Sequence, residues 1–396
     1  MSISSHLMKT AFFMAAIAGL TPDLAMAQAM PATDGHYIDG TYQRLTVPMI
    51  MRANPKSSAK DCDKACPADH LQYQWPGTYF VGAFDGSEVV IKLNDTQNIL
   101  NITVDDQPPV VLTRPGDIEY RLTSLAPGKH TIRLEVVTEY QGALDDKEGF
   151  YGFYVPKNAM PLPVPVSPHQ IEFIGDSYTV GYGNMSPETK CTQDEIWATT
   201  NTKLAFGPLT AQHFKADYQI NAISGRGIVR NFNGGGGRVL PVVYPYSVIM
   251  EPDSEHPLPV VARSETWHPQ IIVIGLGTND FSTPLRGAEQ WKTRDELHAD
   301  YEAYYVAFVK SLRSKNPEAF FILMATDGMQ GEVQSEVSKI IAHLRADGET
   351  RLDFIPMNGL SFGGCNSHPT TADDAKVAQS LIRFIEAKPD LWQDKP

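Results

Sequence analysis

Short runs in which apolar and polar residues alternate fill the first part of the chain. Six of them are TYFVGAF, SEVVIKL, LNITVDD, PVVLTR, HTIRLEVV and GFYGFYV. Turn signals such as Asp85-Gly86 and Pro127-Gly128 separate these runs, and no helical pattern lies between them. A period of two residues at this spacing predicts an all-β sandwich over residues 28–160.

A proline-rich segment, PLPVPVSP at residues 161–168, follows the predicted sandwich, and its four prolines favour an extended linker. Beyond it, apolar strand candidates alternate with helix candidates; the strands are IEFIG, DYQINAIS, IIVIGLG, AFFILMA and LDFIPM. Helices are expected at 294–314, 333–346 and 373–387, and the first carries one apolar stripe of Leu297, Tyr301, Tyr305, Phe308 and Leu312. This alternation predicts a parallel sheet between two helix layers, a three-layer α/β/α domain over residues 169–396.

Four short blocks follow strands of this predicted sheet: GDSYT, SGRG, GTND and CNSHP. The carboxyl ends of parallel strands meet at one edge, so we expect the blocks to lie together. Ser177 is a candidate nucleophile and His368 a candidate base, because a serine needs a group that takes its proton. The backbone N–H groups of Ser177 and Gly225 and the side-chain amide of Asn279 are candidate donors to an oxyanion. Each block alone could be an ordinary turn or cap, but together they supply the parts for acyl transfer.

In this order, GDSYT, SGRG, GTND and HP resemble the four blocks of the SGNH (GDSL-type) hydrolases, whose name-giving residues match Ser177, Gly225, Asn279 and His368. The stretches WPGTYFVGAFDGS, GKHTIRLEV and IEFIGDS also resemble the two-domain carbohydrate esterases of family 2. The resemblance implies a jelly-roll-like β-sandwich followed by an SGNH-hydrolase domain. It also implies a secreted serine esterase that removes O-acetyl groups from plant polysaccharides such as xylan and glucomannan, through an acyl-enzyme intermediate.

The block that carries the histidine departs from the common pattern. Many SGNH hydrolases have an Asp three residues before the His, and here Cys365 stands at that position. The resemblance to family 2 implies that a main-chain carbonyl orients His368 instead, which gives a Ser177–His368 dyad. Asp176 is then structural, and Asp373 and Asp374 are expected to favour the dipole of the last helix.

Two other classes of function remain open. One is a lipase, a thioesterase or a peptidoglycan O-acetyl esterase with the same chemistry, although the accessory sandwich and the lack of an apolar lid disfavour a lipase. The other is a carbohydrate-binding protein with a decayed hydrolase domain, which the intact set of four residues disfavours. Aromatic residues near the blocks could stack on sugar rings or pack in the core; they are Tyr178, Tyr182, Trp197 and Trp267.

The overall composition limits the possible partners. The chain of 396 residues has 42% hydrophobic residues and a formal net charge of −13. Phosphate binding relies on clustered Lys and Arg, and no basic cluster is present, so we expect no nucleic-acid partner. An acidic surface fits an enzyme that acts on a neutral acetylated polysaccharide or oligosaccharide, as a monomer and without a cofactor.

Four cysteines lie in the chain: Cys62, Cys66, Cys191 and Cys365. An even number in an exported chain permits disulfides. Cys62 and Cys66 are close enough in sequence for a disulfide that closes one short loop. Cys191 would then pair with Cys365, although four cysteines allow three pairings. The C-x3-C spacing has no second pair or His set beside it, so no metal site is expected.

The amino terminus has the pattern of an export signal. Lys9 precedes the apolar run from Ala11 to Leu20, and Ala25-Met26-Ala27 forms an A-x-A cleavage site. We therefore predict a signal peptide over residues 1–27 and export to the periplasm or the cell exterior. A membrane anchor is disfavoured, because a spanning helix needs about 20 apolar residues and no other segment is long and apolar enough.

Overall fold

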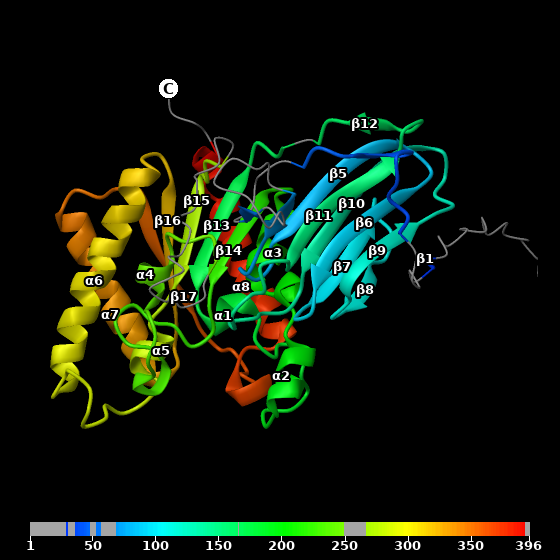
Figure 1. The fold of residues 1–396 in the computed structure, drawn as a ribbon. Helices are drawn as coiled ribbons and strands as arrows, with labels where there is room; N and C mark the ends of the chain where they lie inside the picture. Colours follow the sequence, from blue (N-terminus) through cyan, green and yellow to red (C-terminus); the bar gives the residue numbers. More distant parts are fainter. Residues whose placement is uncertain are drawn as a thin grey trace, which may run out of the picture.

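The computed structural model describes residues 29–30, 36–47, 53–56, 69–164, 166–248 and 267–392 (Figure 1). The predicted signal peptide, residues 1–27, and the cysteines Cys62 and Cys66 lie outside the described residues.

The amino-terminal domain is a sandwich of two antiparallel sheets. One sheet has the order β1 (Ala29–Met30), β9 (Gly116–Leu122), β6 (Val89–Asp95), β11 (Gly149–Pro156), β4 (His70–Gln72), β3 (Asn54–Lys56), with β2 (Tyr42–Arg44) also paired to β11. The other has the order β12 (Met160–Leu162), β5 (Tyr79–Gly86), β10 (Gly128–Val136), β7 (Ile99–Val104), β8 (Val110–Thr113). Apolar side chains from both sheets, among them Phe84, Leu93 and Phe153, form one buried core.

The observed strands include all six predicted runs and add others. β9 was not among the predicted strands, although Ile118, Tyr120 and Leu122 alternate there with three charged residues. β12 pairs with β5 through Met160, Pro161 and Leu162. The first two residues of the segment predicted as a linker therefore continue the sandwich.

The second domain is a parallel sheet between two helix layers, as predicted. The sheet has the order β14 (Asp217–Ala222), β13 (Gln170–Gly175), β15 (Ile271–Gly275), β16 (Phe320–Thr326), β17 (Leu352–Met357). Side chains of α3 (Phe206–His213) and α8 (Thr371–Glu386) pack in the core on one face. Those of α4 (Leu240–Val243), α6 (Arg294–Lys315) and α7 (Glu332–Ala346) pack on the other, and all five residues of the predicted stripe in α6 are buried.

Short helices occupy several of the connections between these elements. They are α1 (Ser177–Val180), α2 (Gln193–Thr199), α5 (Thr278–Phe281), and the 3₁₀ turns η1 (Thr202–Leu204), η2 (Phe232–Gly234), η3 (Met329–Gly331), η4 (Cys365–Ser367) and η5 (Pro389–Trp392). No helix among the described residues is both long and apolar enough to cross a membrane.

The order of the strands decides where a site can form. The chain moves from β13 outward to β14 on one side and to β15 on the other, so the order reverses at β13. In open parallel sheets a crevice forms at such a reversal, at the carboxyl ends of the strands. The loops that follow β13, β14 and β15 therefore lie next to one another.

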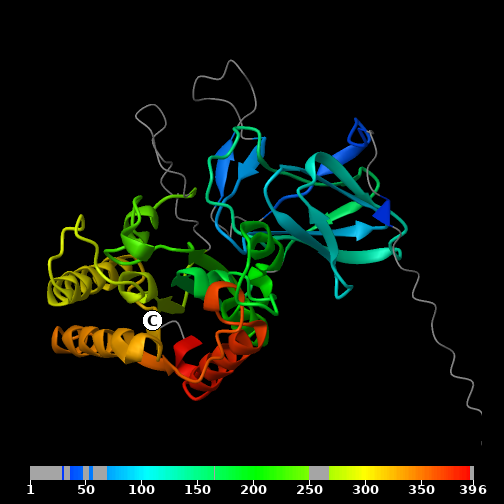
Figure 2. The same cartoon turned by 90° about the horizontal axis from the view of Figure 1, so that it is seen from below.

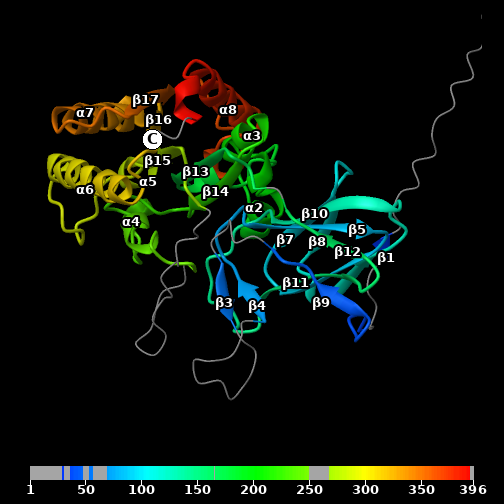
Figure 3. The ribbon, with the colours of Figure 1, turned by 90° about the horizontal axis from the view of Figure 1, so that it is seen from above.

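The two domains lie side by side, with the sandwich next to the β14 edge of the parallel sheet (Figures 2 and 3). At this contact the Arg133 guanidinium of β10 lies 3.4 Å from the ring centre of Tyr79 and donates to the Tyr218 hydroxyl of β14 at 2.9 Å. Tyr218 in turn donates to the buried Glu135 carboxylate. Burial alone would raise the pKa of Glu135, but the charges of Arg133 and Lys203 hold that pKa below its ordinary value.

Trp75, in the loop between β4 and β5, inserts into the core of the second domain. It is 1% exposed and belongs to the same buried cluster as Ile174 and Ile223. Its indole N–H donates to the carbonyl of Tyr246 at 3.0 Å. A side chain of the sandwich thus completes the core of its neighbour, so we infer that the two domains unfold together.

We expect Trp75→Ala to lower the free energy of unfolding by roughly 3–5 kcal/mol, the usual cost of deleting a buried aromatic side chain. Urea unfolding followed by fluorescence and circular dichroism measures this loss. Val111→Ala, at a side chain that is 56% exposed, is the control and should change stability little. A Trp75→Ala protein as stable as the wild type would contradict a shared core.

Candidate active site

Ser177 lies at the first turn after β13. β13 ends at Gly175, and Asp176 caps the short helix α1 by accepting the backbone N–H of Tyr178 at 3.0 Å. Ser177 is therefore the first helical residue, placed at the carboxyl end of β13 and only 5% exposed. His368 comes from the loop between β17 and α8, and its Nε2 lies 2.8 Å from Ser177 Oγ.

The other ring nitrogen of His368 fixes the state of the imidazole. Nδ1 lies 2.9 Å from the carbonyl oxygen of Cys365. A carbonyl can only accept, so Nδ1 carries the hydrogen, and Nε2 of the neutral ring is free to accept the Ser177 proton. Burial lowers the pKa of His368 to about 4, and the rings of Tyr182 and Tyr178 lie 4.4 and 5.4 Å from the imidazole. The His368 imidazole is thus neutral near neutral pH, with Nε2 able to accept a proton.

The loop that carries His368 is tied to the segment after Ser177. A disulfide joins Cys365 to Cys191, which is the pairing that the sequence suggested. The backbone N–H of Asn366 also donates to the carbonyl of Thr189 at 2.7 Å. Gly183 allows the close approach, since a Cβ there would lie 2.4 Å from that of Cys365. These contacts fix the carbonyl that accepts the His368 N–H.

No carboxylate contacts the His368 ring among the described residues. Asp373 accepts hydrogen bonds from the backbone and hydroxyl of Ser361 and from the backbone of Thr370. Asp374 accepts the side-chain amide of Asn184 at 2.9 Å and the backbone N–H of Phe206 at 3.1 Å, and burial raises its pKa to about 7. The two acids therefore do more than favour the helix dipole, because they hold the loops around α8.

The candidate oxyanion donors come from three neighbouring strand ends. Gly225 has a φ of +82°, a conformation that favours glycine. The backbone N–H groups of Ser177 and Gly225 have no acceptor among the residues that the structure describes. Asn279 is buried, and its amide nitrogen donates to Arg226 O at 2.8 Å and to Asp176 Oδ2 at 3.2 Å. Asn279 thus connects the first two blocks, while burial raises the pKa of Asp176 to about 7.

Asp280 was not among the candidate residues, but its side chain holds the backbone directly after the second block. Its carboxylate accepts the backbone N–H groups of Ile228, Val229 and Arg230 at 2.9–3.0 Å. Burial raises the pKa of Asp280 to about 6. Its position beside Asn279 in GTND was the available signal, but three backbone donors 50 residues away cannot be read from the sequence.

The four aromatic residues considered for sugar stacking have different surroundings. Tyr178 and Tyr182 flank His368. Trp197 donates its indole N–H to the carbonyl of Gln97 in the sandwich at 2.9 Å, and Arg114 lies over its ring. Trp267 is 6% exposed and packs in the core. Only the two tyrosines therefore belong to the site.

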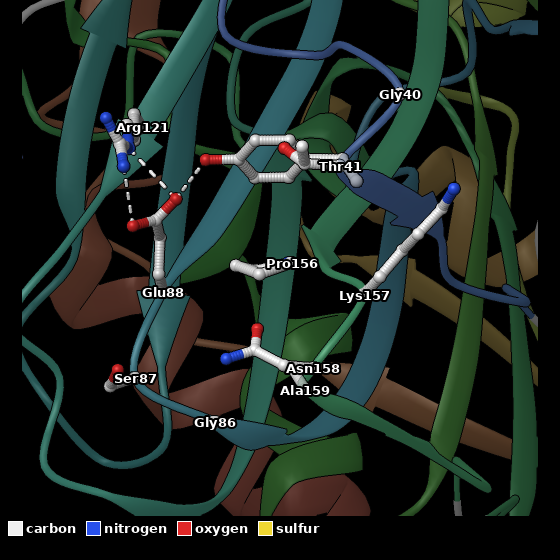
Figure 4. Close-up of a pocket in the computed structure, with 11 residues that line it drawn as sticks. Gly40, Thr41, Gly86, Ser87, Glu88, Arg121, Pro156, Lys157, Asn158 and Ala159 are labelled. Carbon is white, nitrogen blue, oxygen red and sulfur yellow. Dashed lines mark hydrogen bonds and ion pairs between the residues drawn. The ribbon is translucent and has the colours of Figure 1, made fainter.

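A cavity of about 680 Å³ lies elsewhere, at one end of the sandwich (Figure 4). Its lining includes Thr41, Ser87 and Asn158, and none of its residues belongs to the four blocks. The Glu88 carboxylate there is held by Arg121 at 2.7 and 3.0 Å and by the Tyr42 hydroxyl. Within the described ranges, no group of three or more His, Cys, Asp or Glu side chains is placed to hold a metal ion.

Family models match both domains of the chain. Residues 66–165 match the model described as carbohydrate esterase 2 N-terminal. Residues 171–381 match the model of the GDSL-like lipase/acylhydrolases.

Proteins of known activity resemble most of the chain. An acetylxylan esterase/glucomannan deacetylase of Cellvibrio japonicus is 49% identical over 321 residues, which cover 81% of this chain and 86% of that protein. The cellulase/esterase CelE of Acetivibrio thermocellus is 26% identical over 79% of this chain, but this match covers only 37% of CelE.

Solved structures of carbohydrate esterases superpose on most of this chain. A carbohydrate esterase studied for the divergent catalytic and non-catalytic binding functions of its active site superposes with a TM-score of 0.79 and 44% identity, over 89% of this chain and all (100%) of that one. A family two carbohydrate esterase from Clostridium thermocellum, in complex with cellohexaose, has the same fold, with a TM-score of 0.69 and 24% identity over 88% and 100% of the two chains. The relative with 49% identity and the two family models indicate the same family. The chain therefore belongs to family 2 of the carbohydrate esterases and is a carboxylic ester hydrolase with a GDSL-type catalytic domain.

Proposed function

We propose that this esterase removes O-acetyl groups from plant polysaccharides such as xylan and glucomannan, with Ser177 as nucleophile and His368 as base. The observation that carries the proposal is the 2.8 Å contact between Ser177 Oγ and the Nε2 of a neutral, half-buried His368. The acetyl group and the polysaccharide are supported by the relative named acetylxylan esterase/glucomannan deacetylase.

The proposed reaction has two steps. Ser177 Oγ attacks the acetyl carbonyl carbon while His368 Nε2 takes the hydroxyl proton. The tetrahedral intermediate collapses, the sugar oxygen leaves with the proton from His368, and the acetyl group stays on Ser177. A water molecule then gives a proton to His368 and attacks the acetyl carbon. Collapse of the second intermediate returns the proton from His368 to Ser177 and releases acetic acid, which loses its own proton to water and becomes acetate.

The negative charge of each intermediate is stabilised by donors from three blocks. The backbone N–H groups of Ser177 and Gly225 are available, since no described residue accepts them. Asn279 can turn one amide hydrogen toward the oxyanion by giving up its longer bond, the 3.2 Å contact with Asp176. Loss of one such donor typically costs about 10²–10³ in rate.

The carbonyl of Cys365 accepts the Nδ1–H of His368, a role that a carboxylate has in the usual triad. It holds the tautomer that the reaction needs, but it carries only a partial charge. It therefore stabilises the transient imidazolium less than a buried carboxylate would. This arrangement makes Ser177 and His368 a dyad, with the backbone as the orienting group.

The proposal includes export to the periplasm or the cell exterior and action as a monomer. The disulfide between Cys191 and Cys365 supports export, because such bonds persist in oxidising compartments.

Ser177→Ala should lower acetate release from acetylated xylan and glucomannan by at least about 10⁴-fold, because the nucleophile is lost. Ser282→Ala, at an exposed serine, is the matched control and should keep wild-type activity. A small acyl site should also hydrolyse acetyl esters faster than butyryl or octanoyl p-nitrophenyl esters. Faster octanoyl turnover would favour a lipase or thioesterase, and an active Ser177→Ala protein would refute the nucleophile.

His368→Ala should lower kcat by several orders of magnitude, since a base and its nucleophile act as a unit. Asp373→Asn and Asp374→Asn should each lower kcat less than about tenfold, well below the loss of about 10⁴ seen when a triad acid is neutralised. Both should instead lower the free energy of unfolding, by about 1–3 kcal/mol, because one of the two acceptor oxygens of each buried carboxylate is lost. Kinetics with p-nitrophenyl acetate and urea unfolding separate the effects. A loss near 10⁴-fold in either Asp variant would make that residue the third member of a triad.

The acid limb of kcat/KM should have its midpoint near pH 4, because burial lowers the pKa of His368 to about 4. Above that pH the ring is neutral and accepts the Ser177 proton; below it the ring is protonated and the rate falls. Titration of the His368 ring by NMR identifies the group, and circular dichroism shows whether the fold persists. A His368 titration near the ordinary value of about 6.5 would contradict the assignment.

A further inference from the structure

One loop of the sandwich reaches the second catalytic block. It connects β10 to β11, and two of its side chains hold Ser224, the residue before Gly225. The Glu139 carboxylate accepts the backbone N–H of Ser224 at 2.8 Å. The Gln141 side-chain amide donates to the carbonyl oxygen of Ser224 at 3.1 Å. The accessory domain therefore holds both polar backbone groups of this residue.

The second of these bonds determines where the Gly225 N–H points. The Ser224 carbonyl and the Gly225 N–H belong to one planar trans peptide, so they point in opposite directions. Gln141 draws the carbonyl toward the sandwich, and the N–H is therefore directed away from it. The next polar groups of the block are engaged, because Gly225 O accepts Phe232 N–H at 2.8 Å and Arg226 N–H donates to Ile223 O at 3.3 Å.

The loop itself is well fixed. The carbonyl of Val137 accepts the backbone N–H of Thr202 at 2.9 Å, and the Thr138 hydroxyl accepts that of Ile99 at 2.9 Å. Further along, the Gln74 side chain donates to the carbonyl of Gly142 at 2.7 Å. Burial also raises the pKa of Glu139, whose half-buried carboxyl contacts the loop of the second domain. Such a loop can impose an orientation on Ser224 rather than follow it.

We propose that Glu139 and Gln141 are positioning residues of the esterase reaction. They orient the Ser224–Gly225 peptide so that the Gly225 N–H donates to the oxyanion formed at Ser177. The sandwich domain thus completes the catalytic site. The inference rests on the proposed roles of Ser177 and Gly225, but it does not depend on which polysaccharide is the substrate.

Glu139→Ala should lower kcat for p-nitrophenyl acetate by about tenfold to a hundredfold and leave KM nearly unchanged. This is less than the loss of an oxyanion donor outright, about 10²–10³, because the N–H remains but is poorly directed. The Gln141 side chain is exposed, so water can donate to the Ser224 carbonyl in its place, and Gln141→Ala should have a smaller effect of the same kind. Glu139→Gln should recover most of the rate, since its amide oxygen can still accept the Ser224 N–H.

Phosphorylation of Ser177 by diethyl p-nitrophenyl phosphate, which forms a diethylphosphoryl ester of the serine and releases p-nitrophenol, gives a second measurement, because the phosphoryl oxygen occupies the same oxyanion site. Its rate constant should fall in parallel with kcat. The matched controls are Asp106→Ala and Gln107→Ala, at exposed side chains of the sandwich, which should leave both rates unchanged. Melting temperatures show that the variants are folded.

Three results would overturn the proposal. They are wild-type kcat in folded Glu139→Ala and Gln141→Ala proteins, a loss that lies in KM alone, and a failure of Glu139→Gln to recover activity. The Ser177→Ala variant tests the proposed function separately. An inactive Ser177→Ala protein beside unaffected Glu139 and Gln141 variants would therefore refute this inference and keep the proposed function.

Discussion

The contact between the sandwich and β14 is the constraint on which the rest of the structure depends. β14 is an edge strand of the parallel sheet, and an uncovered edge is a template for unwanted pairing. Arg133, Tyr79 and Glu135 cover it with a charged and aromatic network, and Trp75 completes the adjacent core. The Tyr218 hydroxyl of β14 accepts a hydrogen bond from Arg133 and donates one to the buried Glu135 carboxylate, so polar contacts join the two domains at this edge.

This contact has consequences at the carboxyl end of the same strand. The loop after β14 carries Gly225, and it is held from one side by Glu139 and Gln141 of the sandwich and from the other by Asp280 and Asn279. On the far side of Ser177, a disulfide and a backbone carbonyl fix His368. The site is thus assembled from groups that are each anchored before any substrate arrives, which is the condition for effective stabilisation of a developing charge.

Most of the fold could be predicted from the sequence, because its two periodicities are strong. Alternation over short runs identified the main strands of the sandwich, and buried strands between amphipathic helices identified the parallel sheet. The strands β2, β3 and β4 were missed because they have only three residues each, and the seven-residue β9 was missed although its residues alternate. The structure also brought Ser177 and His368 together, as expected for two loops at the same edge of one sheet.

What the sequence by itself determined was the type and order of the chemical groups, because each of the four blocks directly follows or precedes a recognisable element. Tertiary structure alone decided which groups support them. His368 Nδ1 donates to the carbonyl of Cys365, three backbone N–H groups donate to Asp280, and the Ser224 N–H donates to Glu139. All of these contacts involve the backbone, and most of them join distant segments. Every residue has a backbone carbonyl and nearly every residue an N–H. The residue types therefore do not reveal these contacts, and only the packing of the folded chain selects them.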